Sequence, residues 1–333
     1  MRQAWYDRTG TPAEVLRVGD APVPLPRGGE VLVRIRASGI NPSDCKQRRG
    51  WPGMAPTGRI VPHSDGAGVV DRVGEGVDPA LIGQRVWVWG ARGGIFYGFD
   101  GGPEDGTATE FARLPVGHVV PLPDSVGFDI GAAIGAPGCT AHHLVFADGD
   151  VSGQVVMVRG GAGAVGELAV SFASRAGAHV IATVSSPEKA AIARAAGAQQ
   201  VIDYRRQDVA DAVLGAYPGG VHRIIEVDFA ANIVGDAALI RRDGVIASYS
   251  SPSDPSPTLP YYPLQFKGVT VRFVQGAALP SGAQADAVRA ISRGFAEGWL
   301  RPTIAAAFPL DRIADAHALV ESGAQVGKVV LEL

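Results

Sequence analysis

The strongest chemical signal in this chain of 333 residues is a run of glycines that starts at Gly160. Gly161, Gly163 and Gly166 form a Gly-x-Gly-x-x-Gly pattern between a strand-like run and a helix-like run. In dinucleotide sites the first glycine permits a tight turn, the second lets backbone approach a pyrophosphate, and the third lets the helix pack closely. An ordinary glycine-rich turn is the alternative. The strand–helix context favours dinucleotide binding, by Gly161, Ala162, Gly163, Ala164, Val165 and Gly166.

The end of the next strand-like run bears on which dinucleotide binds. An NAD site carries an acidic residue about 20 positions after the glycines, where it accepts from the ribose 2′-hydroxyl. Ser185 stands at that place, so the carboxylate that would repel a 2′-phosphate is missing. Ser186 and Lys189 offer hydrogen-bond donors and a positive charge, so we expect NADPH to be preferred over NADH. Ser186 followed by Pro187 also suits a capped helix start, and the two roles are compatible.

Strand-like and helix-like runs alternate around these residues. The strand-like runs lie at 154–159, 179–184, 200–204, 223–227, 245–248 and 269–274. Helix-like runs lie between the first four of them, at 164–175, 187–196 and 209–214. This alternation predicts βαβ crossovers and an α/β, doubly wound parallel sheet of the Rossmann type. The Pro/Ser-rich segment 251–263 is expected to be a loop.

The first third of the chain has another pattern, with short apolar runs broken by glycine and proline. Apolar residues alternate with polar ones over 31–37, and β-rich stretches follow at 66–73 and 84–89. This predicts a β-barrel-like module with few helices. The period changes near Gly127, so we expect the first domain to end there and the Rossmann domain to cover 128–275.

The composition excludes several classes of protein. A chain of 333 residues with 46% hydrophobic and 19% charged residues is typical of a soluble protein with two domains. The net charge of -3 gives no reason to expect nucleic acid or an anionic membrane as partner, so a small-molecule ligand is expected. The absence of a signal-like or membrane-spanning run predicts a cytoplasmic protein. Cys45 and Cys139 are expected to be buried thiols, a disulfide being the less favoured alternative.

Several segments spread over nearly the whole chain match one family pattern. They are Ser38–Asp44, Pro62–Val70, Gly160–Gly166, Val180–Lys189, Gly197–Ala198 and Gly327–Leu331. Together they resemble the quinone oxidoreductase, or zeta-crystallin-like, family of the medium-chain dehydrogenase/reductase superfamily. The resemblance implies a GroES-like β-barrel substrate domain formed by 1–127 and 276–333. It also implies that Lys189 and Tyr204 contact the 2′-phosphate, with Tyr249 and Lys328 as further cofactor contacts.

The same resemblance bears on metal binding. Zinc-dependent alcohol dehydrogenases of the superfamily use a cysteine, a histidine and a second cysteine, where this chain has Asn41, Ser64 and Pro137. A catalytic zinc needs about three protein ligands, so we expect no metal. His63 and Cys139 lie close to these positions in the sequence, and we interpret them as a structural or solvent-facing histidine and a core thiol.

Without a metal, the protein must align the nicotinamide with the acceptor and stabilise the charge that develops on oxygen. Quinones and activated enones suit such a site. The resemblance places Asn41 and Thr140 beside the cofactor and acceptor as catalytic candidates, although both could be turn or cap residues. Lys46 replaces a tyrosine of many relatives and is either a third candidate or a solvated surface charge. Candidate pocket aromatics are Tyr97, Tyr249, Tyr261 and Tyr262.

Three functions remain open from the sequence. The first is NADPH-dependent reduction of a quinone, and the second is reduction of the C=C bond of an enone, enal or enoyl thioester. The third is NADPH binding without turnover, because a fold alone does not settle function. The family pairs an edge strand to form dimers, and the apolar run 269–274 matches that strand, so a homodimer is expected.

Overall fold

The computed structural model describes residues 1–51, 56, 58–91 and 106–333, and the chain divides into two compact units. Unit 1 comprises Met1–Ala136 and Ile291–Leu333, and unit 2 comprises Pro137–Ala290. Both boundaries differ from the sequence prediction of 1–127 with 276–333, and 128–275. The first differs because the helix that begins just after Gly127, α4 (Phe128–Ala132), packs against strands of unit 1. The assignment of substrate and cofactor roles to the two units stays a prediction.

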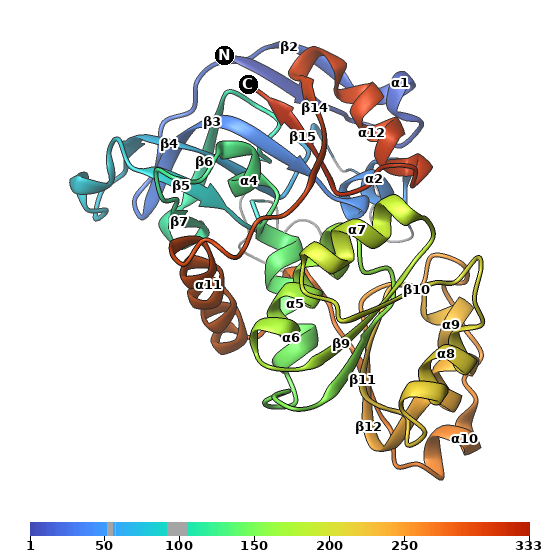
Figure 1. The fold of residues 1–333 in the computed structure, drawn as a ribbon. Coiled ribbons are helices and arrows are strands. Elements are labelled where there is room, and N and C mark those ends of the chain that lie inside the picture. The colour runs from blue at the N-terminus through green and yellow to red at the C-terminus, as the bar shows by residue number, and fades with distance from the viewer. Residues whose placement is uncertain (52–55, 57, 92–105) are drawn as a thin grey trace. The chain divides into compact units, whose positions relative to one another are not determined.

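Unit 1 is built on a seven-stranded sheet and a two-stranded hairpin (Figure 1). The sheet order is β14-β15-β3-β4-β5-β7, with β6 also paired to β3. The strands are β1 (Arg2–Trp5), β2 (Arg17–Asp20), β3 (Glu30–Ile40), β4 (Asp65–Val73), β5 (Arg85–Val88), β6 (Phe111–Pro115), β7 (Val119–Pro121), β14 (Ile304–Pro309) and β15 (Lys328–Glu332). The C-terminal strand β15 therefore lies between β14 and β3, in a sheet whose other strands come mainly from the first half of the chain.

The long strand β3 organises unit 1. It pairs with β4, β6 and β15, and the β3–β4 register shifts twice, which bends the sheet towards the barrel-like form that the sequence predicts. Close approach of α4 requires Gly39, because a Cβ there would lie 1.9 Å from the carbonyl oxygen of Ala132. The short helices of this unit are α1 (Pro12–Val15), α2 (Pro42–Arg49), α4, α12 (Ile313–Ser322) and the 3-10 turns Pro79–Leu81, Val116–His118 and Leu310–Arg312.

Unit 2 confirms the predicted Rossmann architecture. Its six strands are all parallel, in the order β10-β9-β8-β11-β12-β13. They are β8 (Val155–Val158), β9 (His179–Val184), β10 (Gln200–Asp203), β11 (Val221–Glu226), β12 (Ile240–Ser248) and β13 (Thr270–Phe273). In chain order this is 3-2-1-4-5-6, so the direction of winding reverses between β8 and β11. Ligands of such folds bind at the carboxyl ends of the strands beside that reversal.

Helices cover both faces of this sheet (Figure 1). The helices of unit 2 and its connections are α5 (Gly135–Phe146), α6 (Ala164–Arg175), α7 (Pro187–Ala195), α8 (Val209–Ala216), α9 (Phe229–Leu239), α10 (Tyr261–Gln265), the 3-10 turn Gly276–Ala278 and α11 (Ser281–Ala296). The core combines strand residues such as Met157 and Ile224 with Phe229 and Ile233 of α9. The sequence reading had not recognised α9, and α10 takes the end of the segment expected to be a loop.

Both cysteines are free and buried, as the sequence predicts. In the described part of the chain, no helix combines the length and the apolar character that a membrane crossing requires.

Candidate functional site

The glycine-rich loop follows β8 and leads into α6, as the pattern predicts. Gly160 has a φ of 67°, and its N–H donates to Thr183 Oγ1 at 3.2 Å, while the N–H of Gly161 donates to the Thr183 carbonyl at 3.0 Å. A Cβ at Gly166 would lie 2.2 Å from the Gly160 carbonyl oxygen, so α6 can start this close to the loop only with glycine there. A Cβ at Gly163 would meet nothing nearer than 3.5 Å, which leaves that side open to a ligand.

This loop fits a dinucleotide pyrophosphate. The first backbone N–H groups of α6, from Ala164 onwards, have no acceptor within the helix and carry partial positive charge. Gly163 is the residue before that first turn, and it has extended backbone dihedrals (φ -80°, ψ 164°). An anionic group placed beside Gly163 would therefore meet several amide donors without meeting a side chain.

The carboxyl ends of β9 and β10 bring the predicted 2′-phosphate residues next to each other. Ser185 follows β9 directly, and the N–H of Tyr204 donates to the Val184 carbonyl at 3.1 Å. Ser186 caps α7, because its Oγ accepts from the Lys189 N–H at 3.2 Å. The Lys189 side chain is half-buried and that of Tyr204 is about half exposed.

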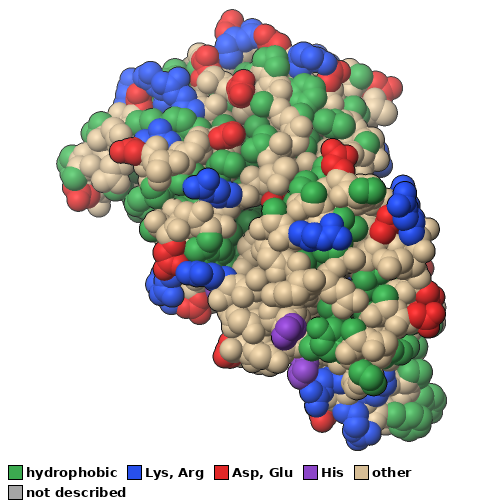
Figure 2. Space-filling model, viewed as in Figure 1, with side chains coloured by type: hydrophobic (Ala, Val, Ile, Leu, Met, Phe, Trp, Pro, Cys, Tyr) green, Lys and Arg blue, Asp and Glu red, His purple; other side chains and the backbone are tan. Residues whose placement is uncertain are grey.

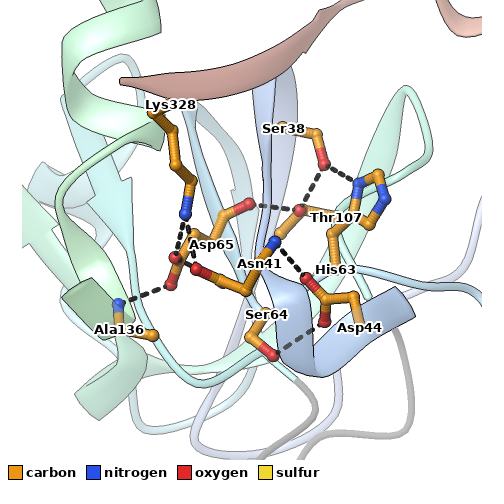
Figure 3. A network of polar contacts seen from close by, with 9 residues as sticks. All are labelled: Ser38, Asn41, Asp44, His63, Ser64, Asp65, Thr107, Ala136 and Lys328. Atoms are coloured by element: carbon orange, nitrogen blue, oxygen red, sulfur yellow. Dashed lines mark hydrogen bonds and ion pairs between the residues drawn. The ribbon is translucent and has the colours of Figure 1, made fainter. Parts of the chain in front are cut away.

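In unit 1 the structure joins Asn41 and Lys328, which lie 287 positions apart in the sequence (Figure 3). Lys328 Nζ donates to Asn41 Oδ1 at 2.6 Å and to Asp65 Oδ2 at 3.2 Å. Asn41 Nδ2 donates to Asp65 Oδ2 at 2.8 Å. Asn41 is also the N-cap of α2, and its backbone N–H donates to Asp44 at 2.7 Å. Asn41 thus serves as both cap and network member, while Lys328, only 3% exposed, carries a buried charge.

Asp65 is the centre of this network and is fully buried. Its Oδ1 accepts from the Ala136 N–H at 2.7 Å, and its backbone carbonyl accepts from Thr107 Oγ1 at 2.5 Å (Figure 3). Gly135 makes room for it, since a Cβ there would lie 2.3 Å from Asp65 Oδ1. The sequence analysis did not single out Asp65. The signal that could have identified Asp65 is an acidic residue at the otherwise apolar start of a strand, because a charge that is buried there needs a partner.

A second chain of buried polar side chains leads from this network to α12. Thr107 accepts from or donates to Ser38 at 2.7 Å, and Ser38 contacts His63 Nδ1 at 2.8 Å. His63 Nε2 lies 2.9 Å from His317 Nε2, and His317 Nδ1 lies 3.4 Å from Cys45 Sγ. Burial, with a smaller effect of Arg48, lowers the pKa of His317 to about 3, so this ring stays neutral. His63 has a left-handed φ of 78° and is fully buried, which makes it structural rather than solvent-facing.

The remaining predicted residues have varied environments. Thr140 of α5 is 7% exposed, and Lys46 lies 4.7 Å above the Trp51 ring, so Lys46 is half-buried instead of solvated. Tyr249 follows β12, and burial together with the charge of Glu226 raises its pKa. Tyr261 and Tyr262 are exposed on α10. Tyr97 lies outside the described residues. Within the described ranges, no group of three or more His, Cys, Asp or Glu side chains is arranged to hold a metal ion.

Comparison with known families agrees with this architecture. The family described as the alcohol dehydrogenase GroES-like domain matches residues 27–124, and the family described as zinc-binding dehydrogenase matches residues 196–331. Both are domains of medium-chain dehydrogenases/reductases. The fold is that of this superfamily of nicotinamide-dependent oxidoreductases.

Relatives that match over nearly their whole length identify the family within this superfamily. The quinone oxidoreductase of Lama guanicoe is 31% identical, over 100% of this chain and 98% of that protein. Among solved structures, an NAD-dependent alcohol dehydrogenase matches with a TM-score of 0.87 and 28% identity, and a mycobacterial protein complexed with NADPH matches with 0.85 and 27%. Each of these matches covers 100% of both chains. The chain therefore belongs to the quinone oxidoreductase family of the medium-chain dehydrogenase/reductase superfamily.

The buried ion pair at Asp65 gives a stability prediction. Replacing Lys328 with Met leaves the Asp65 carboxylate buried without its cation, and we expect a loss of about 3 to 5 kcal/mol in the free energy of unfolding. Arg34→Met is the matched control, because Arg34 pairs with Asp71 at 3.0 Å but is 48% exposed. We expect the control to lose less than about 1 kcal/mol in urea unfolding. Equal losses in the two variants would contradict this account of the network.

Proposed function

We propose that this oxidoreductase transfers hydride from NADPH to a quinone-type acceptor without a metal. The observation that carries the proposal is the meeting of three strand ends in unit 2. The glycine-rich loop follows β8, Ser185 follows β9 and Tyr204 follows β10. The segment Thr183–Pro187 contains no carboxylate, although an acid at this point is what selects NAD.

The charges around Ser185 favour a 2′-phosphate. Lys189 lies in the first turn of α7, so its ammonium is within reach of a phosphate held at the N-terminus of that helix. Asp203, the acid at the end of β10, accepts from the Arg205 N–H at 3.0 Å and lies 3.7 Å from Arg206 Nε. The Asp203 carboxylate therefore already has a cation, the Arg206 guanidinium, beside it.

The side chains of the proposed site suit a quinone as the acceptor, because they can polarise an oxygen atom without a metal. The bound nicotinamide would supply a hydride, and reduction of a quinone to a hydroquinone takes that hydride and one proton. A quinone oxygen needs polarisation by nearby donors but no Lewis acid. The Lys328 ammonium has three N–H groups, and the described contacts use two of them, one for Asn41 and one for Asp65. This leaves an N–H that can meet an oxygen of the cofactor or the acceptor.

The first test measures oxidation of NADPH against a panel of quinones and activated enones. We expect turnover with quinones and no effect of a chelator, because Asn41, Ser64 and Pro137 offer no thiolate or imidazole to zinc. Turnover confined to enones would assign the chain to double-bond reduction. Binding of NADPH without turnover of either class would contradict the proposal.

The second test concerns cofactor choice. We expect NADPH to bind more than tenfold tighter than NADH, because tenfold is about 1.4 kcal/mol and a charge-assisted hydrogen bond contributes roughly 1.5 to 3 kcal/mol. Lys189→Ala should weaken NADPH by about tenfold and leave NADH unchanged. Ser185→Asp should go further, because the new carboxylate repels the phosphate and accepts from the ribose hydroxyl. Both cofactors are titrated at one salt concentration.

The control for this test is Arg194→Ala, which removes an exposed charge from the last turn of the same helix. It should leave the NADPH dissociation constant unchanged. If Lys189→Ala weakens NADH as much as NADPH, Lys189 supports the fold of the loop and does not select the phosphate.

We also propose that two copies pair through β13. This strand is the last in the order of its sheet, and among the described strands only β12 pairs with it. Phe273 on it is 69% exposed. Figure 2 shows hydrophobic side chains gathered over α10, where Tyr261, Tyr262 and Phe266 are 61%, 65% and 70% exposed. An unpaired edge strand and an exposed apolar patch are both features that a soluble protein normally covers.

The pairing predicts a dimer by light scattering after size-exclusion chromatography. Phe273→Lys should shift the protein to a monomer, because a charge on an edge strand opposes strand pairing. Ile82→Lys is the control, since Ile82 is an exposed apolar residue of unit 1. It should remain a dimer. A monomeric wild type, or a dimeric Phe273→Lys variant with native circular dichroism, would refute this interface.

A further inference from the structure

Three charged side chains lie buried together in unit 2, and the proposed function uses none of them. Arg159 follows β8, Glu226 ends β11, and Asp236 is in the second half of α9. Arg159 is 8% exposed, and both acids are fully buried. The cluster sits at the carboxyl ends of β8 and β11, where the sheet reverses its direction of winding.

The Arg159 side chain lies against both acids. Asp236 Oδ1 accepts from Arg159 Nε at 3.1 Å and from Arg159 Nη2 at 2.6 Å. Glu226 Oε2 lies 3.8 Å from Arg159 Nε, too far for a hydrogen bond. The other oxygen of that carboxylate, Oε1, accepts from Asn232 Nδ2 at 3.0 Å and from the backbone N–H of Asp228. One guanidinium thus faces two carboxylates.

Each carboxylate has one oxygen without a donor. Within the described residues, Glu226 Oε2 and Asp236 Oδ2 are buried and have no hydrogen-bond partner. A buried acceptor without a donor costs free energy, and a second buried negative charge costs more. A single proton between the two acids removes both costs, because it supplies a donor and makes the cluster neutral. The pKa of Glu226 rises to about 8, mainly through burial and then through the charge and hydrogen bonding of Asp236.

The other titratable groups around Glu226 do not supply a second cation. Tyr249, at the end of β12, has its pKa raised by burial and by the charge of Glu226, so its phenol stays neutral. Asp228, at the start of α9, is acidic and binds the Ser253 hydroxyl and N–H. Arg159 is the cation that the described contacts place against the pair.

The cluster is tied to the glycine-rich loop by direct contacts. Arg159 immediately precedes Gly160, and its N–H donates to the Ile225 carbonyl at 2.9 Å. A Cβ on Gly160 would lie 3.2 Å from Val227 Cγ1, so the loop also packs on the residue after Glu226. A change in the charge of the cluster therefore acts on the segment that would cradle a pyrophosphate.

We propose that Glu226 and Asp236 share one proton in the working protein, and that this protonated pair positions the glycine-rich loop for the dinucleotide. The second half of the proposal rests on the proposed cofactor function. Loss of the proton places a net negative charge beneath the loop, where it repels the pyrophosphate and weakens the anchoring of Arg159. Glu226 and Asp236 are positioning residues, because they act through Arg159 and the loop.

The sign of the pH dependence follows from the direction of the shift. The pKa of Glu226 rises from its ordinary value of 4.5 to about 8 on folding, so the folded protein holds a proton that the unfolded chain has released. The stability that this proton provides is complete below the ordinary value. It is lost as the pH rises through about 8.

The experiment compares wild type with Glu226→Gln, whose amide can keep the Asn232 and Asp228 contacts and donate to Asp236 Oδ2. Thermal unfolding without cofactor is followed from pH 6 to pH 9.5, and NADPH and NADH are titrated at pH 7 and pH 9. Asp211→Asn, at an exposed acid in the first turn of α8, is the matched control. Should Glu226→Gln fail to fold, Asp236→Asn replaces it, because its amide can donate to Glu226 Oε2.

We expect the melting temperature of wild type and of Asp211→Asn to fall between pH 7 and pH 9, and that of Glu226→Gln to lack this fall. The dissociation constants of both cofactors should rise by up to about tenfold for wild type, the ratio of protonated fractions for one group with a pKa of about 8. Those of Glu226→Gln should stay constant.

Two results would overturn the proposal. A Glu226→Gln melting curve with the same pH dependence as wild type would show that no shared proton is lost in this range. A pH-independent dissociation constant of wild type, with a pH-dependent melting temperature, would show that the pair does not position the loop. Failure of either cofactor to bind at pH 7, with the melting behaviour as expected, would count against the proposed function and leave the shared proton supported.

Discussion

A carboxylate that has no access to water, Asp65, determines how much of unit 1 must be arranged. A buried negative charge is tolerated only when donors and a cation surround it, and here they come from widely separated segments. Asn41 lies at the start of α2, the Ala136 N–H lies at the start of α5, and Lys328 lies on the last strand. The C-terminal strand therefore completes the electrostatics of a site whose other members lie in the first half of the chain.

The same requirement explains details that look unrelated. Gly135 is needed because Asp65 Oδ1 occupies the space of a side chain, and Thr107 is needed to bind the Asp65 carbonyl. The strained backbone of His63 lies two residues before Asp65, and buried contacts with Ser38 and His317 hold that ring. A residue in the left-handed region persists only where its surroundings determine it. The histidine chain and the Asp65 network therefore stabilise one another.

Much of unit 2 was predictable from the sequence because its signals are local. Strand-like and helix-like runs alternate within a few residues of one another, and the glycine pattern specifies its own turn. The sequence therefore predicted α6 at Ala164–Arg175 with its observed bounds, and β9 at His179–Val184 likewise. The sequence did not predict helix α9, because Phe229–Leu239 contains β-branched residues and a glycine, which have low helix propensity. Its helical form depends on the packing of Phe229 and Ile233 into the core.

The polar networks were much harder to predict, because their partners are distant in the sequence. Asn41 and Lys328 were both expected near the cofactor, yet nothing local indicated that they bind each other across 287 positions. Their joint partner Asp65 was missed for the same reason. For Lys46 the sequence left two alternatives, a catalytic candidate and a solvated surface charge, and the structure places its ammonium 4.7 Å from the centre of the Trp51 ring.

The two units thus compensate their buried carboxylates in different ways. In unit 1 the buried acid Asp65 has its own cation, Lys328, whose Nζ lies 3.2 Å from Asp65 Oδ2. In unit 2 two buried acids share one guanidinium, and neutrality there requires a proton that solution pH can remove. The shared proton that we propose makes the glycine-rich loop beside it sensitive to pH. We place this pH sensitivity in unit 2, because there two buried acids, Glu226 and Asp236, lie against one cation, Arg159.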